Sequence, residues 1–381
     1  MTGAGPLFAE PLPPLDVSGR LDRLRETLPD AGVDGLLVTA AANIRWLTGF
    51  TGSAGLLLVT PQRAVLTSDG RYRTQSEEQL AEAGVAQAVD IVIGGVQVQR
   101  EAMVAAWGAM VNLGLEADDV TWSGQRAWDE ALGSDVALVP TRGCVEALRQ
   151  VKDAGEVARM ERAAAIADEA LASVVPLLVR AEAESVTEAF VAAALDHAMR
   201  VRGAEDSAFE TIVASGPNSA KPHARPSDRQ IRSGDPVVID FGAIYEGYRS
   251  DMTRTFCVGG EPDGELARVF SVVAESQRVG VAAVAPGVVT GDVDRACRDV
   301  IAEAGWAERF EHGTGHGVGL DIHEAPSVGP GATAILAPGV VATVEPGVYL
   351  AGVGGVRIED TLVVVEDGSR PLTMFPKDVS L

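Results

Sequence analysis

The sequence is poor in cysteine and in basic residues, and each shortage argues against a class of function. Three cysteines occur in 381 residues, and no two of them form a C-x-x-C pair. A disulfide framework is therefore not expected. We expect the three thiols to be free in a reducing cytoplasm. Lysine and arginine total 31 against 54 aspartate and glutamate residues, which leaves a formal charge of −23. Such a surface repels nucleic acid and anionic membranes, because contact with phosphate needs basic side chains. The simplest consequence of the acidic charge is solubility.

Long apolar runs are also missing. No run approaches the roughly 18 residues that a membrane-spanning helix needs, so no membrane partner is expected. The N-terminus has neither the basic nor the apolar segment of a secretory signal peptide, and we expect no leader. The proline-rich start, residues 1–15, is expected to be a flexible arm.

Two regions of different pattern follow this arm. Up to about residue 140, short apolar strands alternate with helical segments, which predicts an α/β domain with a partly parallel sheet. The turn-like stretch Pro140–Cys144 then leads into a long helix rich in alanine, glutamate and arginine, from about Ala154 to Val174. Beyond it, pairs of helices precede hairpins, which is typical of an α+β domain. We therefore predict an N-terminal domain over residues 1–145 and a C-terminal domain over residues 146–381.

The most informative residues are the histidines and acids of the C-terminal region. Four of the five histidines lie between His223 and His323, interleaved with carboxylates in two apparent hairpins. In the first hairpin, Asp240 and Asp251 are equidistant from a turn at Tyr245–Glu246, which predicts that they face each other across the strands. Two such carboxylates repel by about 4 kcal/mol at ~4 Å and an effective dielectric of about 20. A cation is therefore expected between them.

The second hairpin repeats the arrangement with glutamates. Glu345 and Glu359 each lie seven residues from Gly352, where the chain is expected to turn. Arg357 shares the face of Glu359, because side chains two residues apart on a strand point the same way, and it can orient a carboxylate or a substrate. A single acid in a strand is usually a solvated residue, but two symmetric pairs are poorly explained in that way. With His316, the four acids form a donor set for two oxygen-preferring cations.

Other features of this region have simpler explanations. The glycine-rich run Gly313–Gly319 lacks the strand-then-helix context and the lysine of a nucleotide-binding loop. Its glycines are expected instead to let the backbone approach a cation and a substrate. His197 lies within the alanine-rich helical stretch from Thr187 to Val201, and we interpret it as an ordinary structural residue.

These motifs resemble those of the M24 "pita-bread" metallopeptidases, the family that contains methionine aminopeptidase, aminopeptidase P and prolidase. The matching segments are Val-Ile-Asp240-Phe-Gly, Ser-Asp251-Met-Thr-Arg, His312-Gly-Thr-Gly-His316-Gly-Val-Gly-Leu-Asp-Ile-His323-Glu, Thr-Val-Glu345-Pro-Gly-Val-Tyr and Gly-Gly-Val-Arg-Ile-Glu359-Asp-Thr. The resemblance extends from about Val151 to the end of the chain and implies a pita-bread (creatinase/aminopeptidase) fold for the C-terminal domain. A further segment, from Phe209 to His223, is similar to the branch of the family that acts on Xaa-Pro bonds.

The resemblance also implies a role for each residue. The implied metal ligands are Asp240, Asp251, His316, Glu345 and Glu359. Two divalent ions are expected, with Mn²⁺ as the first candidate and Co²⁺, Zn²⁺ or Fe²⁺ as alternatives. Asp240 would bind one ion, Asp251 and Glu359 would bridge both, and His316 with Glu345 would complete the other. A water or hydroxide between the ions would be the nucleophile, and Glu345 would carry its proton to the leaving proline nitrogen. His223 and His323 would stabilise the scissile carbonyl, and His312 would line the substrate pocket.

The N-terminal region resembles the creatinase/prolidase N-terminal domain. The similar segments are Asn43-Ile-Arg-Trp46-Leu-Thr-Gly-Phe-Thr-Gly-Ser and Thr67-Ser-Asp-Gly-Arg71-Tyr72. Methionine aminopeptidases generally lack such a domain and creatinases lack the full ligand set, which favours the Xaa-Pro branch. The resemblance also implies a homodimer, in which the N-terminal domain of one chain lies near the active site of the other. Trp46, Arg71 and Tyr72 are the candidates for that contact.

Two activities remain open within the Xaa-Pro branch. Prolidases cleave only dipeptides, and in one group an arginine four residues after the second active-site histidine holds the free carboxylate. That position is Ser327 here, and no lysine or arginine occurs between Asp321 and Leu350. We therefore predict an aminopeptidase P, acting on peptides with proline at the second position. Prolidase is the alternative if an arginine from elsewhere supplies the clamp. A non-catalytic peptide-binding module would typically have lost metal ligands, and all five are present.

Overall fold

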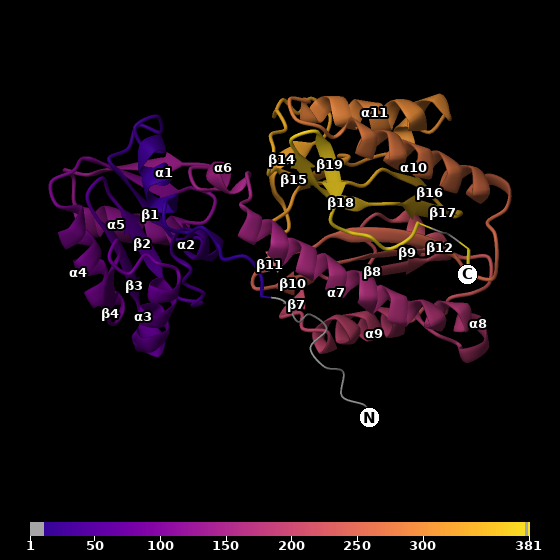
Figure 1. Cartoon of the computed structure of the whole chain (residues 1–381), viewed down its shortest axis with the longest axis horizontal. Coiled ribbons are helices and arrows are strands. Elements are labelled where there is room, and N and C mark those ends of the chain that lie inside the picture. The colour runs from indigo at the N-terminus through magenta and orange to yellow at the C-terminus, as the bar shows by residue number, and fades with distance from the viewer. Residues whose placement is uncertain (1–10, 378–379) are drawn as a thin grey trace. The chain divides into compact units, whose positions relative to one another are not determined.

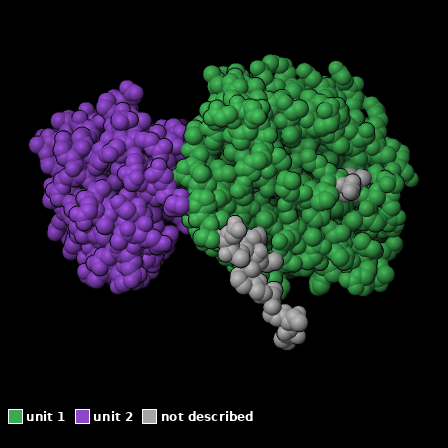
Figure 2. Space-filling model, viewed as in Figure 1, with its two compact units in different colours: residues 1–13, 150–381 green, residues 14–149 purple. Residues whose placement is uncertain are grey.

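The computed structural model describes residues 11–377 and 380–381 and divides into two compact units (Figure 2). Residues 14–149 form the N-terminal unit, and residues 150–381 form the C-terminal unit together with the segment up to Pro13. The division falls after Arg149, whereas the sequence pattern placed the boundary after residue 145. Of the flexible arm predicted for residues 1–15, residues 1–10 lie outside the described residues, and residues 11–15 belong to no helix or strand.

A six-stranded mixed sheet is the centre of the N-terminal unit. The elements of this unit are α1 (Arg20–Thr27), β1 (Gly35–Val38), α2 (Ala41–Thr48), β2 (Leu56–Val59), β3 (Ala64–Ser68), the 3-10 helix η1 (Gly70–Tyr72), α3 (Arg73–Glu82), β4 (Asp90–Ile93), α4 (Val96–Trp107), β5 (Asn112–Glu116), α5 (Trp122–Leu132), β6 (Ala137–Thr141) and α6 (Glu146–Arg149). The strand order is β4-β3-β2-β1-β5-β6. The pairs β1–β5, β5–β6 and β3–β4 are parallel, and β1–β2 and β2–β3 are antiparallel. The predicted α/β domain with a partly parallel sheet is therefore confirmed.

Trp46 lies in the core of this unit, which makes one expectation from the sequence wrong. It is part of α2 and is 1% exposed, and the guanidinium groups of Arg20 and Arg23 lie 4.6 and 5.2 Å from its ring centre. An indole buried in this way cannot reach the active site of a partner subunit while the unit remains folded. Arg71 and Tyr72 lie on η1, where neither side chain is buried. They stay candidates for such a contact.

The C-terminal unit consists of two helix pairs and the strands between them (Figure 1). Its elements are α7 (Ala154–Val179), α8 (Ala181–Glu184), α9 (Glu188–Val201), β7 (Asp206–Ser207), β8 (Ile212–Ser215), the 3-10 helix η2 (Gly216–Ala220), β9 (Pro236–Phe241), β10 (Ala243–Tyr245), β11 (Tyr248–Arg249), β12 (Met252–Cys257), α10 (Gly264–Ala283), α11 (Thr290–Glu303), the 3-10 helix η3 (Ala307–Arg309), β13 (Gly315–Gly317), β14 (Glu324–Val328), β15 (Val341–Val344), β16 (Gly347–Leu350), β17 (Gly354–Arg357), β18 (Asp360–Val365) and β19 (Gly368–Pro371). Helix α7 packs on α9, and α10 packs on α11.

Each helix pair covers its own group of strands and closes its own hydrophobic core. The first core joins α7 and α9 to β8, β9 and β12, with Leu171 and Ile239 completely buried. The second joins α10 and α11 to β15, β17 and β18, with Val273 and Val344 completely buried. Burial of such side chains contributes about 1.5–3 kcal/mol each relative to exposure. The predicted α+β pita-bread architecture, with helices and a hairpin in each half, is confirmed. None of the helices within the described residues has the length and apolar content to cross a bilayer.

The register of the first hairpin differs from the predicted one by two residues. The turn is at Glu246–Gly247, and Asp240 lies opposite Thr253 rather than opposite Asp251. Asp251 falls in the gap between β11 and β12. The prediction that the two aspartates are directly opposed was therefore wrong. Because side chains alternate with a period of two, a shift of two residues still leaves both aspartates on the same face.

The gap in this hairpin depends on a close approach at Gly242. A Cβ atom at this position would lie 1.9 Å from the carbonyl oxygen of Ser250. The amide of Ala243 bonds to the Ser250 hydroxyl at 3.0 Å, while the Ser250 amide donates to the Ala243 carbonyl at 3.0 Å. The ladder is thus interrupted for two residues and then resumes. The interruption leaves the Asp251 side chain free to turn into the space beside β12.

The second hairpin has the predicted register. Strands β16 and β17 pair with Gly347 opposite Arg357, and β15 and β18 pair with Val344 opposite Asp360. Both ladders share the centre of symmetry at Gly352. Glu345 and Glu359 fall at the junction between the two ladders, where the Glu345 amide donates to Thr314 and the Glu359 amide donates to Thr253. The junction frees both glutamate side chains from the strands and turns them toward the first hairpin.

Candidate functional site

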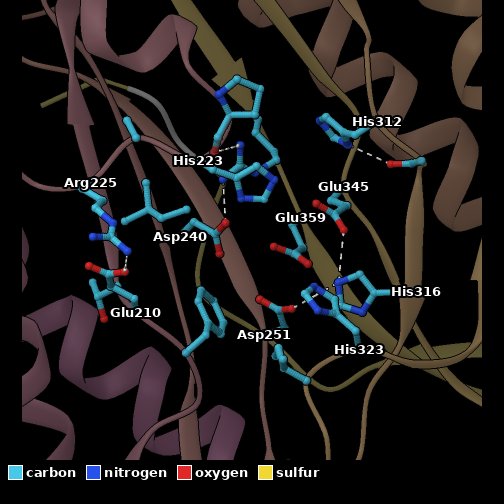
Figure 3. Close-up of a pocket in the computed structure, with 18 of the residues that line it drawn as sticks. Glu210, His223, Arg225, Asp240, Asp251, His312, His316, His323, Glu345 and Glu359 are labelled. Atoms are coloured by element: carbon cyan, nitrogen blue, oxygen red, sulfur yellow. Dashed lines mark hydrogen bonds and ion pairs between the residues drawn. The ribbon is translucent and has the colours of Figure 1, made fainter. Parts of the chain in front are cut away.

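A cavity of about 460 Å³ in the C-terminal unit is lined by every residue that the sequence proposed as a metal ligand or catalytic residue (Figure 3). These residues are His223, Asp240, Asp251, His312, His316, His323, Glu345, Arg357 and Glu359. They come from the ends of β9 and β17, from β13, from the gaps in both hairpins and, for His223, His312 and His323, from loops. Segments more than a hundred residues apart in the chain therefore meet in one place, as the spacing of the acids predicted.

The acids form a compact, buried cluster around His316. One donor atom from each of Asp251, His316 and Glu359 can be chosen so that all three lie within 4.8 Å of one another. The His316 Nε2 atom is 3.6 Å from Asp251 Oδ2 and 3.4 Å from Glu345 Oε1. Burial and the neighbouring carboxylates raise the pKa of Asp251 and of Glu359 well above the ordinary range, and burial raises the pKa of Glu345 to about 8. The cluster thus favours either bound protons or a bound cation.

The donor set fits divalent cations. The Oδ1 atom of Asp240 and the Oε1 atom of Glu359 are buried and have no hydrogen-bond partner within the described part of the chain. Buried carboxylate oxygens are costly unless they are bonded or coordinate a metal. Four carboxylates with one imidazole match the oxygen-rich coordination that Mn²⁺ and similar ions accept. Asp240, Asp251, His316, Glu345 and Glu359 are thus the residues able to hold such ions.

The ring of His316 is oriented as a metal ligand requires. Its Nδ1 atom lies 3.0 Å from the carbonyl oxygen of Gly317 and must donate to it, which leaves the Nε2 lone pair facing the acids. Burial lowers the pKa of His316 to about 4, so the ring is neutral at pH 7. Gly317 permits this arrangement, since a Cβ atom there would lie 2.2 Å from the carbonyl oxygen of Ala325 on β14. The ring of His323 packs edge-on against His316, with 4.4 Å between ring centres.

A chain of hydrogen bonds connects Asp240 to His312. Arg357 donates to Asp240 Oδ2 at 2.5 Å and to the Tyr349 hydroxyl at 2.8 Å. That hydroxyl lies 2.8 Å from His312 Nε2, and His312 Nδ1 lies 2.8 Å from the Gly313 carbonyl. Because the carbonyl only accepts, Nδ1 carries the proton and Nε2 accepts from Tyr349. His312 therefore fixes Tyr349, which helps to hold Arg357 beside Asp240.

Arg357 is almost completely buried and belongs to the acid cluster. Its side chain is 3% exposed and its Nε atom donates to Thr253 Oγ1 at 3.2 Å. The Thr253 hydroxyl in turn donates to Glu359 Oε2 at 2.7 Å. Arg357 therefore contacts a carboxylate, as predicted. It binds Asp240 directly and is connected to Glu359 through the Thr253 hydroxyl.

The segment that carries His223 is held by a buried glutamate on α9. Glu188 is completely buried, and its Oε1 atom accepts from the amide and the hydroxyl of Ser215, both at 2.7 Å. Its Oε2 atom accepts from the hydroxyl of Ser227 at 2.6 Å and from the amide of Ser227 at 3.1 Å. Asn218 donates to both oxygens at 3.1 and 3.2 Å. Both ends of the segment are therefore tied to one carboxylate.

Several side chains of the site were not anticipated from the sequence. Tyr349 and Thr253 connect the acids to the histidines, and Glu210 and Arg225 line the cavity on another side. Glu210, Thr253 and Tyr349 lie within the segments that resemble the family, and Arg225 lies two residues after His223. The contact of Thr253 with Glu359 depends on tertiary packing between the two hairpins, whereas Tyr349 and Arg357 lie on the paired strands β16 and β17 of one hairpin. Ser327, which stands where one group of prolidases has an arginine, lies on β14 opposite His316.

Comparison with known proteins agrees with this geometry. Residues 158–366 match the model of metallopeptidase family M24, and residues 20–151 match the creatinase/prolidase N-terminal domain. The chain is 40% identical over 360 residues to the uncharacterized peptidase YqhT of Bacillus subtilis, covering 94% of this chain and 99% of that protein. The fold and the site define a metallopeptidase built on the pita-bread fold, and the chain belongs to metallopeptidase family M24.

Two solved structures are similar over nearly the whole chain. The first is an Xaa-Pro dipeptidase from Bacillus anthracis, with a TM-score of 0.89 and 40% identity over 95% of this chain and 99% of that one. The second is an X-Pro aminopeptidase from Thermotoga maritima, with a TM-score of 0.84 and 35% identity over 95% of this chain and 100% of that one. The two carry different names, so similarity does not decide between a dipeptidase and an aminopeptidase.

Proposed function

We propose that this protein is an aminopeptidase P, a dinuclear-metal enzyme that removes the N-terminal residue from peptides with proline at the second position. The observation that carries the proposal is the gathering of four acids and a neutral imidazole around one cavity, with two buried carboxylate oxygens left without hydrogen bonds in the described structure. The names of the similar structures, an Xaa-Pro dipeptidase and an X-Pro aminopeptidase, support the Xaa-Pro bond as the target.

In this proposal, Asp240, Asp251, His316, Glu345 and Glu359 hold two divalent ions, with Mn²⁺ as the expected metal. When bound, the ions supply a water of lowered pKa and polarise the scissile carbonyl. Glu345, at the junction of the second hairpin, transfers a proton to the leaving proline nitrogen in this proposal. His223 and His323 donate to the carbonyl oxygen as it gains charge. Arg357 fixes the orientation of Asp240, and His312 acts through Tyr349.

The preference for longer peptides rests on Ser327. At this position, four residues after His323, an arginine would hold the free carboxylate of a dipeptide, and serine cannot. The alternative, a strict dipeptidase, would require another arginine of the cavity to bind this carboxylate so strongly that longer peptides are excluded. We further propose a homodimer in a reducing cytoplasm. The three cysteines, which form no disulfide in the described chain, support that location.

Hydrolysis of Ala-Pro and of Ala-Pro-Ala with added Mn²⁺ tests the proposal. We expect metal-dependent turnover of both peptides, with the tripeptide preferred. Turnover of the dipeptide alone would establish the alternative, and turnover of neither would refute an Xaa-Pro peptidase. Asp251→Ala should abolish turnover while the protein stays folded. Asp292→Ala, which removes an exposed acid on α11, is the matched control and should retain it.

A further inference from the structure

A second arginine lines the cavity, away from the acid cluster. Arg225 and Glu210 lie together on one side, while His316 and His323 lie on the other side, with Asp240 and Asp251 between (Figure 3). Arg225 belongs to the same segment as His223 and immediately precedes Pro226. A residue before proline is restricted to extended conformations, so the backbone of Arg225 has little freedom.

The two arginines of the cavity differ in how many of their N–H donors are open to a ligand. Arg357 is 3% exposed, and its donors are used by Asp240, Tyr349 and Thr253. The side chain of Arg225 is 81% exposed and, among the described residues, makes one ion pair, in which Nη2 lies 3.2 Å from Glu210 Oε2. Among the described residues that line the cavity, Arg225 is thus the cation with donors open to an incoming ligand. A guanidinium has five donors and binds a carboxylate best through two parallel hydrogen bonds.

The ion pair with Glu210 is weak enough to be exchanged. Glu210 is 64% exposed, and pairs between such exposed side chains typically contribute about 0–1 kcal/mol. A carboxylate that enters the cavity therefore competes with Glu210 for Arg225 at little cost. In the proposed function the four acids around His316 are neutralised by two divalent ions, so Arg225 is the open positive charge on the His223 side of the cavity. A short peptide brings a carboxylate that can meet this charge.

We infer that Arg225 binds the C-terminal carboxylate of dipeptide substrates by exchanging Glu210 for it, and that Glu210 holds Arg225 when the peptide is longer. This inference rests on the proposed function and deepens it. The cation that is missing at Ser327 is then supplied by the segment after His223. Specificity for peptide length is set by a competition between two carboxylates, that of Glu210 and that of the substrate, for one guanidinium.

The test compares Ala-Pro with Ala-Pro amide, which differ only in the terminal charge. In the Mn²⁺-loaded full chain, Arg225→Gln should lower the ratio of kcat/KM for Ala-Pro to that for Ala-Pro amide by about tenfold. Glu210→Gln should raise the same ratio severalfold, because Arg225 is no longer held. Arg232→Gln removes an exposed arginine that does not line the cavity, and it should leave the ratio unchanged. An unchanged ratio in Arg225→Gln would overturn the inference.

A binding measurement separates this inference from the proposed function. L-proline and L-prolinamide contain no Xaa-Pro bond, so calorimetry of their binding to the Mn²⁺-loaded protein does not depend on turnover. We expect wild type to prefer proline and Arg225→Gln to lose that preference. If wild type hydrolyses Xaa-Pro peptides and Arg225→Gln keeps its preference for proline, the inference fails and the function stands. If wild type hydrolyses no Xaa-Pro peptide, the proposed function fails, and the inference that rests on it fails as well.

Discussion

Glu188 offers a direct test of how the His223 segment is held, through the change Glu188→Gln. The substitution keeps the size of the side chain and replaces one acceptor oxygen with an NH₂ group. Each oxygen of Glu188 faces one serine whose backbone amide and hydroxyl both donate to it. The serine hydroxyl can rotate and accept from the new NH₂ group, but the backbone amide cannot. One backbone N–H, that of buried Ser215 or that of half-buried Ser227, is therefore left without its acceptor, whichever way the glutamine amide points.

The expected cost follows from these contacts. A buried N–H that loses its partner costs about 1–3 kcal/mol, and the remaining bonds also lose the strength given by a charged acceptor. We expect Glu188→Gln to lower the free energy of unfolding by about 2–4 kcal/mol. Because Ser215 and Ser227 flank the segment that contains His223, kcat/KM for Xaa-Pro peptides should fall in the same variant, under conditions in which it is fully folded.

Urea denaturation followed by circular dichroism measures the stability change. Glu184→Gln is the matched control, because Glu184 lies four residues earlier at the end of α8 and its side chain forms an exposed ion pair with Arg180. That change should cost less than about 1 kcal/mol. If Glu188→Gln destabilises no more than Glu184→Gln does, the buried carboxylate does not hold the segment as the contacts indicate, and the reasoning is refuted.

Three further predictions concern the metal, the strand gap and pH. Mn²⁺ at a hundredfold excess over its Kd should stabilise the chelator-treated protein by about 2.7 kcal/mol in thermal unfolding, and Asp251→Asn should remove most of this gain. Gly242→Ala should destabilise by about 1–3 kcal/mol or more in urea unfolding, because its Cβ would meet the Ser250 carbonyl, whereas Gly70→Ala, with open space, should not. Burial lowers the pKa of His312 to about 4 from an ordinary value of 6.5. The unfolded chain therefore binds more protons between these values, so stability should fall by about 3 kcal/mol as the pH drops from 6.5 to 4. In His312→Gln this part of the pH dependence should be absent, and an unchanged profile would contradict the assignment.

The sequence anticipated the two-part architecture because its periodicity and its helix-forming composition agree with the fold. The register of the second hairpin was also predictable, since its glycine-rich tip marks the centre of symmetry at Gly352. The first hairpin was predicted two residues out of register, because the turn was placed at Tyr245–Glu246, although Gly247 favours a two-residue turn at Glu246–Gly247 with both φ angles positive. Glu246 adopts a positive φ of 44° there, a conformation that non-glycine residues seldom adopt.

The candidate ligands were predictable and their supporting contacts were not. Spacing alone pointed to the four acids, because a two-residue error in register leaves side chains on the same face. The contacts of Thr253 with Glu359 and of Glu188 with Ser227 join segments whose approach is decided by tertiary packing. Trp46 was misassigned for the same reason. Trp46 was predicted to contact the active site of a partner subunit, but its ring is buried in the core of its own unit.

The division of the second hairpin into two ladders has a consequence for how this protein can change. The β15–β18 ladder sets the register at the base independently of the tip, so extra residues at positions 351–353 would leave Glu345 and Glu359 in place. One residue inserted between Glu345 and Gly347 would instead reverse the facing of β16 and displace Tyr349 from Arg357. Loop lengthening at the tip is therefore a route by which such an enzyme can acquire new surface features without losing its chemistry. The few residues beside each glutamate tolerate no such insertion.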